Sequence, residues 1–572
     1  MARTSLAVVF AGSGGSGAMT AGAVFLRAAA HAGYYGMMSQ LFGAQVRGGE
    51  SASLVQLSTE PIEAQPDRYD VFVALDWDKV EQFAAEIPLD ETSVIVADPA
   101  AGPVPAGIAR SQGRVVPLTM GDAHATKLER AMIGKRVNMF ATGCLCALAG
   151  IGGADVTAAI DTIFAGREEG LIAANAASAA LGAAAAPSLP LDLRLDPPHG
   201  AGRWLISGNQ AIAFGAVRGG VRFVGCYPIT PATDLVEWLA PHLIGLGGRL
   251  VLGEDELASV NMALGASYGG TPAMTVTSGP GFSLMIETLG LAVAAEIPLV
   301  LVDVMRAGPS TGIASKTEQS DINLAIHGGH GDAPRVVLAP VSVADCVSTA
   351  EYAVYVAESL QTPVIVLSDQ ALGQATTVID PTARRPVPLR RRVDGVDRSK
   401  PFKRYATSGD PVTPMPLPGT PHLEWVAEGL THNEAGLPAS GAAAHVAQIE
   451  KRARKIRQFD PGPQWGEVWG DGDVAVVAIG STIGPAREAA RRLAARGSAI
   501  RVVALRVLSP LPAAALAHAL DGVRRVVVVE QNHSGQLYHY LLGEKAIPPD
   551  AESVARPGPA PFRPGEIVSH VL

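Results

Sequence analysis

Four short apolar runs in the middle of the chain are each followed by a polar or glycine-containing loop. The runs cover residues 222–225, 249–252, 273–276 and 299–304. A helix-like segment follows each loop, and this repeated order of strand, loop and helix predicts a parallel α/β sheet. In such a sheet the loops at the carboxyl ends of the strands collect at one edge and form the ligand site. We therefore expect these four loops to converge in space.

The four loops carry side chains suited to binding and proton transfer. Thr230 lies in a segment whose backbone is fixed by prolines on both sides, and Arg306 offers a planar fork that matches a carboxylate. Three acids, residues 254–256, follow the second run at a predicted helix start, where acids are also favoured for purely structural reasons. A lone arginine after a strand is also commonly structural. Taken alone, the acids and the arginine favour the structural interpretation.

A glycine-rich turn, residues 12–17, lies near the N-terminus between an apolar run and an alanine-rich helical segment. The turn matches the spacing G-x-G-x-x-G, which suggests an NAD-dependent dehydrogenase. Such a site also requires an acidic residue about 20 positions further on, and residues 33–47 contain neither Asp nor Glu. A tight turn without a nucleotide is therefore favoured.

The C-terminal part of the chain predicts a further α/β unit. Its strands are expected at 474–479, 500–505 and 526–529, with an amphipathic helix at 485–496. Residues 176–202 are rich in alanine, proline and glycine and are interpreted as a linker. The 572 residues suffice for several domains of ordinary size.

Composition excludes several classes of protein. The chain is 48% hydrophobic and 17% charged, with a formal net charge of −9, which argues against disorder and against a nucleic-acid partner. No signal peptide is recognisable, and the apolar runs are interpreted as too short or too charged to span a membrane, so we expect a cytoplasmic protein. The four cysteines, at 144, 146, 226 and 346, form no iron–sulfur or disulfide pattern.

Four ordered motifs carry a family resemblance. Residues 227–231 (Tyr-Pro-Ile-Thr-Pro), 254–256 (Glu-Asp-Glu), 277–281 (Thr-Ser-Gly-Pro-Gly) and 306–312 (Arg-Ala-Gly-Pro-Ser-Thr-Gly) resemble the pyrimidine-binding domain of 2-oxoacid:ferredoxin oxidoreductases. The resemblance implies bound thiamine diphosphate, whose carbanion chemistry the protein assists by binding and orientation.

The same resemblance implies roles for individual residues. Glu256 is expected to hydrogen-bond the aminopyrimidine N1′ of the cofactor, and Thr230 and Arg306 to hold the carboxylate and carbonyl of a 2-oxoacid, so that these three are the catalytic candidates. The remaining cofactor-binding candidates are Tyr227, Pro228, Ile229, Ser278, Gly279, Pro280 and Gly281. No role is assigned to His327 or His330.

The regions on either side also resemble parts of this family. We expect a gamma-like domain at 1–190, the pyrimidine-binding domain at 200–380, an irregular strap at 381–465 and a transketolase C-terminal-like domain at 466–572. In relatives the gamma domain lies near coenzyme A, which implies an anion site formed by Gly12, Gly14, Gly15, Gly17 and Arg47, although Arg47 is equally well a solvated loop arginine.

Part of the expected machinery is missing from the sequence. Thiamine enzymes bind magnesium and diphosphate with a Gly-Asp-Gly motif that is followed further along the chain by Asn. This chain has Gly-Asp-Gly around Asp471, but no Asn occurs between Asp473 and Gln531. Asp471 is therefore interpreted as a turn residue. The resemblance implies a beta subunit that carries magnesium, the diphosphate contacts and a [4Fe-4S] cluster in an alpha2beta2 assembly, with no metal in this chain.

The resemblance implies oxidative decarboxylation of 2-oxoglutarate to succinyl-CoA, reversibly, with electrons passed to ferredoxin. Pyruvate or a branched 2-oxoacid is the alternative substrate. An NAD-dependent dehydrogenase and a non-catalytic scaffold remain as other classes, but a scaffold has no need for Glu256, Thr230 and Arg306 in one cleft.

Overall fold

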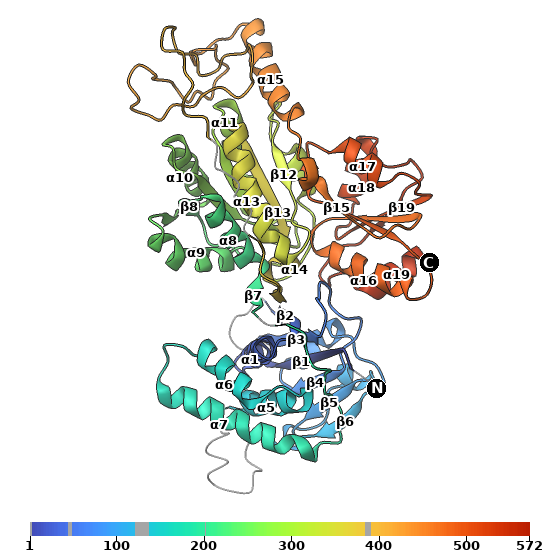
Figure 1. Cartoon of the computed structure of the whole chain (residues 1–572). Coiled ribbons are helices and arrows are strands. Elements are labelled where there is room, and N and C mark those ends of the chain that lie inside the picture. The colour runs from blue at the N-terminus through green and yellow to red at the C-terminus, as the bar shows by residue number, and fades with distance from the viewer. Residues whose placement is uncertain (1–2, 44–48, 121–135, 201, 384–390) are drawn as a thin grey trace. The chain divides into compact units, whose positions relative to one another are not determined.

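The computed structural model describes residues 3–43, 49–120, 136–200, 202–383 and 391–572 (Figure 1). Backbone contacts divide the chain into two units. The first comprises Met1–Ser207, Gln374–Pro381 and Arg563–Glu566, and the second comprises Gly208–Gly373, Thr382–Phe562 and Ile567–Leu572. Both combine helices with β-sheets, which confirms the predicted multidomain α/β class.

The first unit is built on an eight-stranded mixed sheet in the order β6-β5-β4-β1-β3-β2-β14-β7. The strands β1, β4, β5 and β6 run parallel, whereas β1, β3, β2, β14 and β7 pair antiparallel. Strand bounds are Ser5–Ser13 (β1), Tyr35–Phe42 (β2), Glu50–Ser58 (β3), Val71–Ala74 (β4), Val94–Ala97 (β5), Arg114–Pro117 (β6), Trp204–Ser207 (β7) and Thr376–Ile379 (β14). Both β7 and β14 therefore join this sheet, although the sequence suggested that residues 200–380 belong to one other domain.

Helices of the first unit cover the sheet. They are α1 (Ala18–His31), α2 (Val80–Phe83), α3 (Ala106–Ala109), α5 (Val137–Ala149), α6 (Gly153–Ile163) and α7 (Glu169–Ala185). One face of the sheet packs on a core that includes Phe10, Phe25 and Phe140. The other face packs on a core that includes Phe72 and Phe83. Because β1 is buried on both faces, its sequence is continuously apolar rather than alternating.

Helix α7 corrects the prediction that a linker begins at residue 176. A Cβ atom at Gly182 would lie 1.9 Å from the carbonyl oxygen of Phe140, so α7 and α5 pack backbone to backbone. Helices in such close contact need small residues, and the alanine-rich sequence reflects this packing rather than a loop. By length and composition, Glu169–Ser188 is also the one described helix apolar enough to cross a membrane, contrary to expectation, although buried core helices satisfy the same criteria.

The second unit contains a seven-stranded sheet in the order β18-β12-β13-β11-β10-β8-β9, parallel except for β18. Its strands are β8 (Phe223–Cys226), β9 (Arg249–Leu252), β10 (Ala273–Thr277), β11 (Leu299–Met305), β12 (Val336–Leu338), β13 (Pro363–Asp369) and β18 (Val507–Ser509). Its helices are α8 (Gly208–Gly219), α9 (Thr233–Gly245), α10 (Glu256–Tyr268), α11 (Gly279–Ala294), α12 (Ile322–His327), α13 (Val343–Leu360) and α14 (Gln370–Gln374). The four strands predicted here are confirmed to within about one residue.

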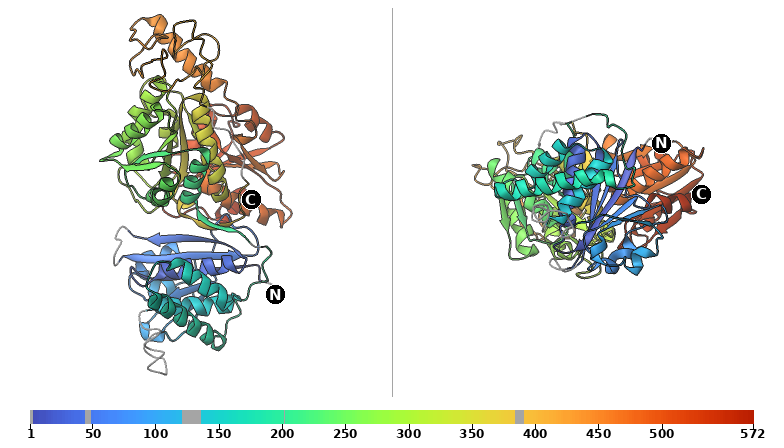
Figure 2. Two further views of the ribbon diagram at one scale, coloured as in Figure 1. Left: turned by 60° about the vertical axis from the view of Figure 1, so that its left-hand side comes forward. Right: turned by 90° about the horizontal axis from the view of Figure 1, so that it is seen from below.

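A five-stranded sheet in the order β15-β17-β16-β19-β20 completes the second unit (Figure 2). Its strands are β15 (Gly466–Trp469), β16 (Val474–Ala478), β17 (Arg501–Leu505), β19 (Arg525–Glu530) and β20 (Glu552–Ala555), with helices α16 (Ile483–Ala494), α17 (Ala513–Ala519), α18 (Gln536–Gly543) and α19 (Pro564–Val571). One apolar core contains Phe282 and Leu301 from the seven-stranded region together with Leu505 and Leu537 from this one. The two sheets therefore share a single core.

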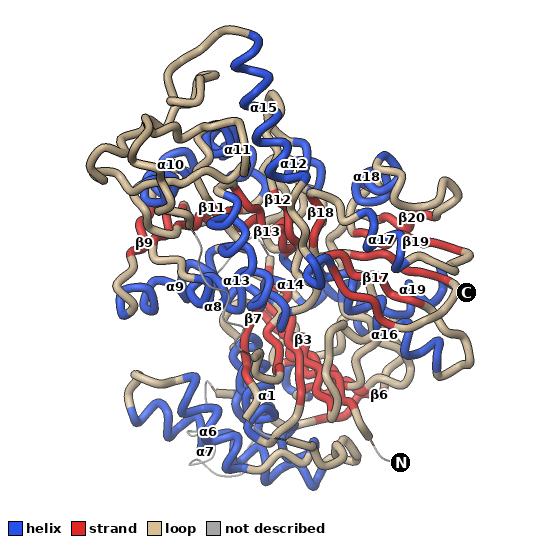
Figure 3. The backbone as a smooth tube through the Cα atoms, turned by 45° about the horizontal axis from the view of Figure 1, so that its top comes forward, coloured by secondary structure: helices blue, strands red, loops and turns tan. Residues whose placement is uncertain are grey.

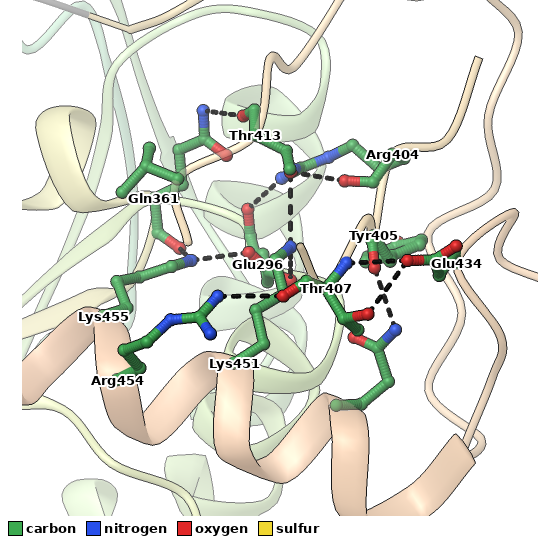
Figure 4. Close-up of polar contacts among 12 residues, drawn as sticks. Glu296, Gln361, Arg404, Tyr405, Thr407, Thr413, Glu434, Lys451, Arg454 and Lys455 are labelled. Carbon is green, nitrogen blue, oxygen red and sulfur yellow. Dashed lines mark hydrogen bonds and ion pairs between the residues drawn. The ribbon is translucent and has the colours of Figure 1, made fainter. Parts of the chain in front are cut away.

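Residues 391–440 form a strap almost without helix or strand, drawn mainly as loop in Figure 3, and lead into α15 (Ala442–Arg457). The strap is held by a buried ion cluster centred on Glu296 (Figure 4). Lys451 and Lys455 of α15 lie 2.5 and 2.6 Å from the two Glu296 carboxylate oxygens. Arg404 of the strap donates to the Glu296 backbone carbonyl at 2.7 Å.

The charges of this cluster depend on one another. Burial alone would raise the pKa of Glu296, but Lys455, Lys451 and Arg404 outweigh burial and hold that pKa far below its usual range. Burial lowers the pKa of Lys451 to about 7, against the opposing effect of Glu296. Because three cations surround one buried carboxylate, the carboxylate cannot be removed without leaving buried charge unpaired.

We expect Glu296→Gln to destabilise the second unit by about 3–5 kcal/mol, the usual effect of breaking a buried ion pair on one side. The measurements are the urea midpoint of unfolding and the rate of proteolysis within residues 391–440. The matched control is Glu450→Gln on α15, because the pair of Glu450 with Arg457 is solvent-exposed and such pairs contribute at most about 1 kcal/mol. Equal effects of the two substitutions would contradict this account of the strap.

Candidate functional site

The carboxyl ends of β8, β10 and β11 meet at one edge of the seven-stranded sheet. Strand β10 lies between β8 and β11, parallel to both, and pairs Thr277 with Asp303 at its end. Arg306, directly after β11, donates from Nη1 to the backbone carbonyl of Thr230 at 2.6 Å. The loops that the sequence predicted to converge therefore do converge.

Of the three neighbouring acids, only Glu256 is buried. Glu256 is the first residue of α10 and is 8% exposed. Asp255 caps the same helix, its Oδ1 accepting from the Ala258 amide at 2.7 Å, and Glu254 is exposed. Because the Asp255 carboxylate already serves the helix and Glu254 faces solvent, Glu256 is the one buried acid of the three at this sheet edge.

The turn at residues 278–281 gives Glu256 its space. A Cβ atom at Gly281 would lie 2.7 Å from Glu256 Oε1 and 2.2 Å from Thr277 Oγ1. Real Cβ atoms do not approach so closely, so only glycine permits this contact between α10 and α11. Ser278, fully buried before α11, donates from Oγ to the Val304 carbonyl at 2.8 Å and ties the turn to β11.

The segment 227–231 lies beside Arg306 and is partly open to solvent. Tyr227 is 39% exposed, and Ile229 and Thr230 are half-buried. Asn209 of α8, fully buried, donates from Nδ2 to the Pro231 carbonyl at 2.8 Å. Sequence reasoning missed this support, for which the signal was a polar pair, Asn209 and Gln210, at the start of a mostly apolar helix.

Arg306 is buried next to two carboxyl groups. It is 7% exposed, and its Nε has no hydrogen-bond partner among the described residues. Burial lowers the Arg306 pKa, while Asp321 and Asp303 oppose that shift. The backbone bond to Thr230 fixes one edge of the guanidinium, which leaves the group suited to holding an anion with its remaining donors.

Asp303 and Asp321 were not predicted as site residues. Asp303 lies near the end of β11, and Asp321 precedes the first residue of α12. A Cβ atom at Gly279 would lie 2.8 Å from Asp321 Oδ2, so Asp321 borders the glycine turn at the start of α11. The available signal was an acid within the otherwise apolar run 299–304.

The glycine turn at residues 12–17 lies in the first unit, between β1 and α1. Ser13 donates to Asp76 from both its amide and its hydroxyl, at 2.9 Å each, and the Gly14 amide donates to the Gly49 carbonyl at 2.7 Å. Gly15 and Gly17 have φ angles of 110° and 83°, which only glycine adopts readily. Arg47, the other expected anion contact, lies outside the described residues. The backbone amides of Ser13, Gly14 and Ser16 are thus already occupied, the last by the Ser13 carbonyl at 3.0 Å.

Metal-binding side chains do not gather in the described residues. No group of three or more His, Cys, Asp or Glu suited to a metal ion occurs there, and all four cysteines are buried and unpaired. His327 packs its ring edge-on against Tyr540 at 5.7 Å. His327 therefore has a packing contact, and neither it nor His330 is given a chemical role.

Comparisons with known proteins agree with this geometry. Three family models match: pyruvate flavodoxin/ferredoxin oxidoreductase, thiamine diphosphate-binding, over residues 214–451; pyruvate ferredoxin/flavodoxin oxidoreductase over 7–185; and pyruvate:ferredoxin oxidoreductase core domain II over 472–547. These ranges fall on the regions that the sequence motifs had marked.

Curated relatives match the larger part of the chain. The 2-oxoglutarate oxidoreductase subunit KorA of Mycobacterium tuberculosis is 38% identical over 63% of this chain and 56% of its own length. The 2-oxoglutarate synthase subunit KorA of Methanothermobacter marburgensis is 35% identical over 64% of this chain and 98% of its own length. The match thus spans little more than half of the first relative and nearly all of the second.

A solved structure matches throughout. The 2-oxoglutarate:ferredoxin oxidoreductase from Magnetococcus marinus, with 2-oxoglutarate, coenzyme A and succinyl-CoA bound, is 35% identical, with a TM-score of 0.89, over 100% of this chain and 99% of that one. The fold and the site edge define a thiamine diphosphate-binding α/β protein. The chain belongs to the 2-oxoacid:ferredoxin oxidoreductase family, which confirms the family predicted from the four motifs.

We expect the isolated chain to contain no stoichiometric iron or acid-labile sulfide, because its buried cysteines lie on separate elements apart from Cys144 and Cys146 of α5. Metal analysis and the visible absorption spectrum of the purified chain test this. A brown protein with about four irons per chain would contradict the assignment of the cluster to a partner.

Proposed function

We propose that the chain is the alpha subunit, with a fused gamma domain, of a 2-oxoglutarate:ferredoxin oxidoreductase. The reaction converts 2-oxoglutarate, coenzyme A and two oxidised ferredoxins into succinyl-CoA, carbon dioxide, a proton and two reduced ferredoxins, and it is reversible. The observation that carries the proposal is the placement of Glu256 against Gly281 at the same sheet edge as Thr230 and Arg306.

Thiamine diphosphate, when bound, would supply the carbanion chemistry that decarboxylation of a 2-oxoacid requires. The fit of this cofactor rests on the buried Glu256 carboxyl and on the space left by Gly281. Glu256, only 8% exposed, would share a proton with the aminopyrimidine N1′. Tyr227, Pro228, Ile229 and the turn at 278–281 would hold the ring in place.

Arg306 and Thr230 would hold the substrate. The guanidinium is fixed through Nη1 to the Thr230 carbonyl, so its orientation is set before a carboxylate arrives. A fixed, buried cation binds a carboxylate more strongly than a mobile surface one, because little order is lost on binding. The substrate class is supported by the printed names of the M. tuberculosis, M. marburgensis and M. marinus proteins. Pyruvate or a branched 2-oxoacid is the alternative.

A beta subunit would complete the enzyme. The edge of the sheet around Glu256 exposes four apolar side chains, which support burial by a partner: Leu252, Leu257, Leu284 and Ile313. The proposal places magnesium, the diphosphate contacts and the [4Fe-4S] cluster in that subunit, in an alpha2beta2 enzyme of the cytoplasm that reduces ferredoxin.

The proposed domain division remains 1–190, 200–380, 381–465 and 466–572, with β7 and β14 crossing its first boundary. Coenzyme A would bind the gamma-like domain near Gly12, Gly14, Gly15, Gly17 and Arg47. The support is the open glycine turn, in which Gly15 would tolerate a nearby ligand, since nothing lies within 4 Å of a Cβ built there.

In the enzyme reconstituted with its beta subunit, Glu256→Gln is expected to lower kcat by roughly 10²- to 10⁴-fold, because an amide keeps the shape but cannot share a proton with N1′. Viologen reduction with 2-oxoglutarate measures this. The matched control is Glu254→Gln, an exposed acid two residues away, which should stay within about twofold. A wild-type rate for Glu256→Gln would place the proton-sharing acid elsewhere.

Arg306→Lys is expected to lower kcat/KM for 2-oxoglutarate roughly ten- to hundredfold, because the charge remains but one charge-assisted hydrogen bond is lost. Arg306→Ala should lower it further. Exchange of the C2 proton of bound thiamine diphosphate, followed by NMR, should survive both changes, since it does not involve the substrate. Arg249→Lys, at an exposed arginine of β9, is the control. Loss of exchange in Arg306→Ala would mean that Arg306 supports the cofactor instead.

A further inference from the structure

Asp303 is a buried acid without a hydrogen-bond donor. Its side chain is 0% exposed, and neither carboxylate oxygen has a partner among the described residues. An ionised carboxylate in such a place is strongly disfavoured, so the group either is neutral or shares a proton with a neighbour. Burial raises the pKa of Asp303 well above its usual range, and the neighbouring Asp321 raises it further.

Asp321 supplies that neighbour. Its Oδ2 is also buried without a partner. Two carboxylates only accept hydrogen bonds, so their contact is favourable only if one of them carries a proton. Burial raises the pKa of Asp321 to about 6, while the neighbouring Asp303 opposes the rise. One shared proton would satisfy these buried oxygens and leave the two groups together with a single negative charge.

The charged groups around the pair are few. Arg306 lowers the pKa of both acids, and Glu318, in the loop before α12, raises that of Asp321. Asp369, at the end of β13, is occupied by Gln319 Nε2 at 3.1 Å and by the amides of Leu372 and Ser481 at 2.9 Å each. Glu256 faces Gly281 on the other side of α11. Arg306 is thus a cation that acts on both acids.

The loop that carries Asp321 is held from the C-terminal region. The backbone N–H of Gln319 donates to the backbone carbonyl of Gln531 at 2.7 Å. The side-chain Oε1 of Gln319 accepts from the backbone N–H of Gln531 at 3.0 Å. Asn532 Nδ2 donates to the Gln319 carbonyl at 3.0 Å and to Glu530 at 2.6 Å. Gln536 Nε2 donates to the Ser320 carbonyl at 2.8 Å. This clamp fixes the position of Asp321.

We propose that Asp303 and Asp321 are positioning residues that share one proton near Arg306 and hold its guanidinium in place. The proposal rests on the proposed role of Arg306 toward the substrate carboxylate. With one charge on the pair, Arg306 has a counter-ion that holds it in the site. With two charges the pair would repel an incoming carboxylate, and with none the buried guanidinium would lose its counter-ion.

Asparagine substitutions test the shared proton. Asp303→Asn supplies an amide N–H where the proton lies, so Asp321 keeps its charge and kcat/KM for 2-oxoglutarate should stay within about threefold. The double variant Asp303→Asn/Asp321→Asn has no charge, and kcat/KM should fall roughly ten- to hundredfold with kcat at saturation largely retained, the effect expected for loss of one charged contact. Asp332→Asn, an exposed acid after α12, is the control.

The pH profile separates this role from a structural one. In the reconstituted enzyme, kcat/KM should fall as the pH drops below about 6, where the pair takes up its second proton and becomes neutral. Asp303→Asn should still show this fall of kcat/KM at low pH. The double variant should be flat between pH 5 and 8, at the level that the wild type reaches in acid. A wild-type kcat/KM with an intact acid limb in the double variant would overturn the proposal.

Infrared difference spectra between the wild-type full chain and Asp303→Asn, both without substrate, detect the shared proton directly. The carbonyl band of a buried protonated carboxylic acid should be present at pH 7 and absent in Asp303→Asn. If the band is present but Arg306→Ala leaves the KM for 2-oxoglutarate unchanged, the proposed function of Arg306 fails while the shared proton stands. If the band is absent from the wild type, the pair itself is wrong.

Discussion

The site depends on the parallel pairing of β8, β10 and β11, which places three loops at one sheet edge. The positions of Glu256 and Arg306 are set by contacts with other segments as well as by the helix or strand that precedes or carries them. Glu256 approaches α11 only because residue 281 has no side chain, and Arg306 is held by the backbone of a segment 76 residues earlier in the chain. A side chain at position 281 would push α10 and α11 apart and move the acid.

The four motif blocks, the strands that lead into them and the convergence of their loops were predictable from the sequence. All of these follow from local patterns, since apolar runs, glycine turns and helix starts are written over a few residues. The choice of Glu256 over Glu254 and Asp255 required the resemblance at first, and the structure supports it through burial and through the capping role of Asp255. The site assignments themselves remain predictions until they are measured.

What the sequence could not provide are contacts between distant segments. Three contacts join residues that no local pattern connects: Asn209 with Pro231, Asp76 with Ser13, and Asp321 with Gly279. The helical nature of residues 176–185 was missed because close helix packing selects small residues and removes the usual periodicity.

The C-terminal region supports the site edge. It contacts Gln319 and Ser320 in the loop before α12, and it shares an apolar core with the seven-stranded sheet. The strap is fixed in turn by the charges around Glu296. Residues far from the site edge therefore determine how rigidly its polar groups are held, which is the property that substrate binding by a fixed arginine requires.

The central claim is that Glu256 and Arg306 face one bound cofactor and its substrate. An experimental structure of the chain with its beta subunit, thiamine diphosphate and 2-oxoglutarate tests this most directly. The account predicts a Glu256 carboxyl oxygen within about 2.6–3.2 Å of the aminopyrimidine N1′ and the substrate carboxylate on the Arg306 guanidinium. An aminopyrimidine that contacts neither Glu256 nor the turn at 278–281, or a substrate carboxylate bound away from Arg306, would contradict it.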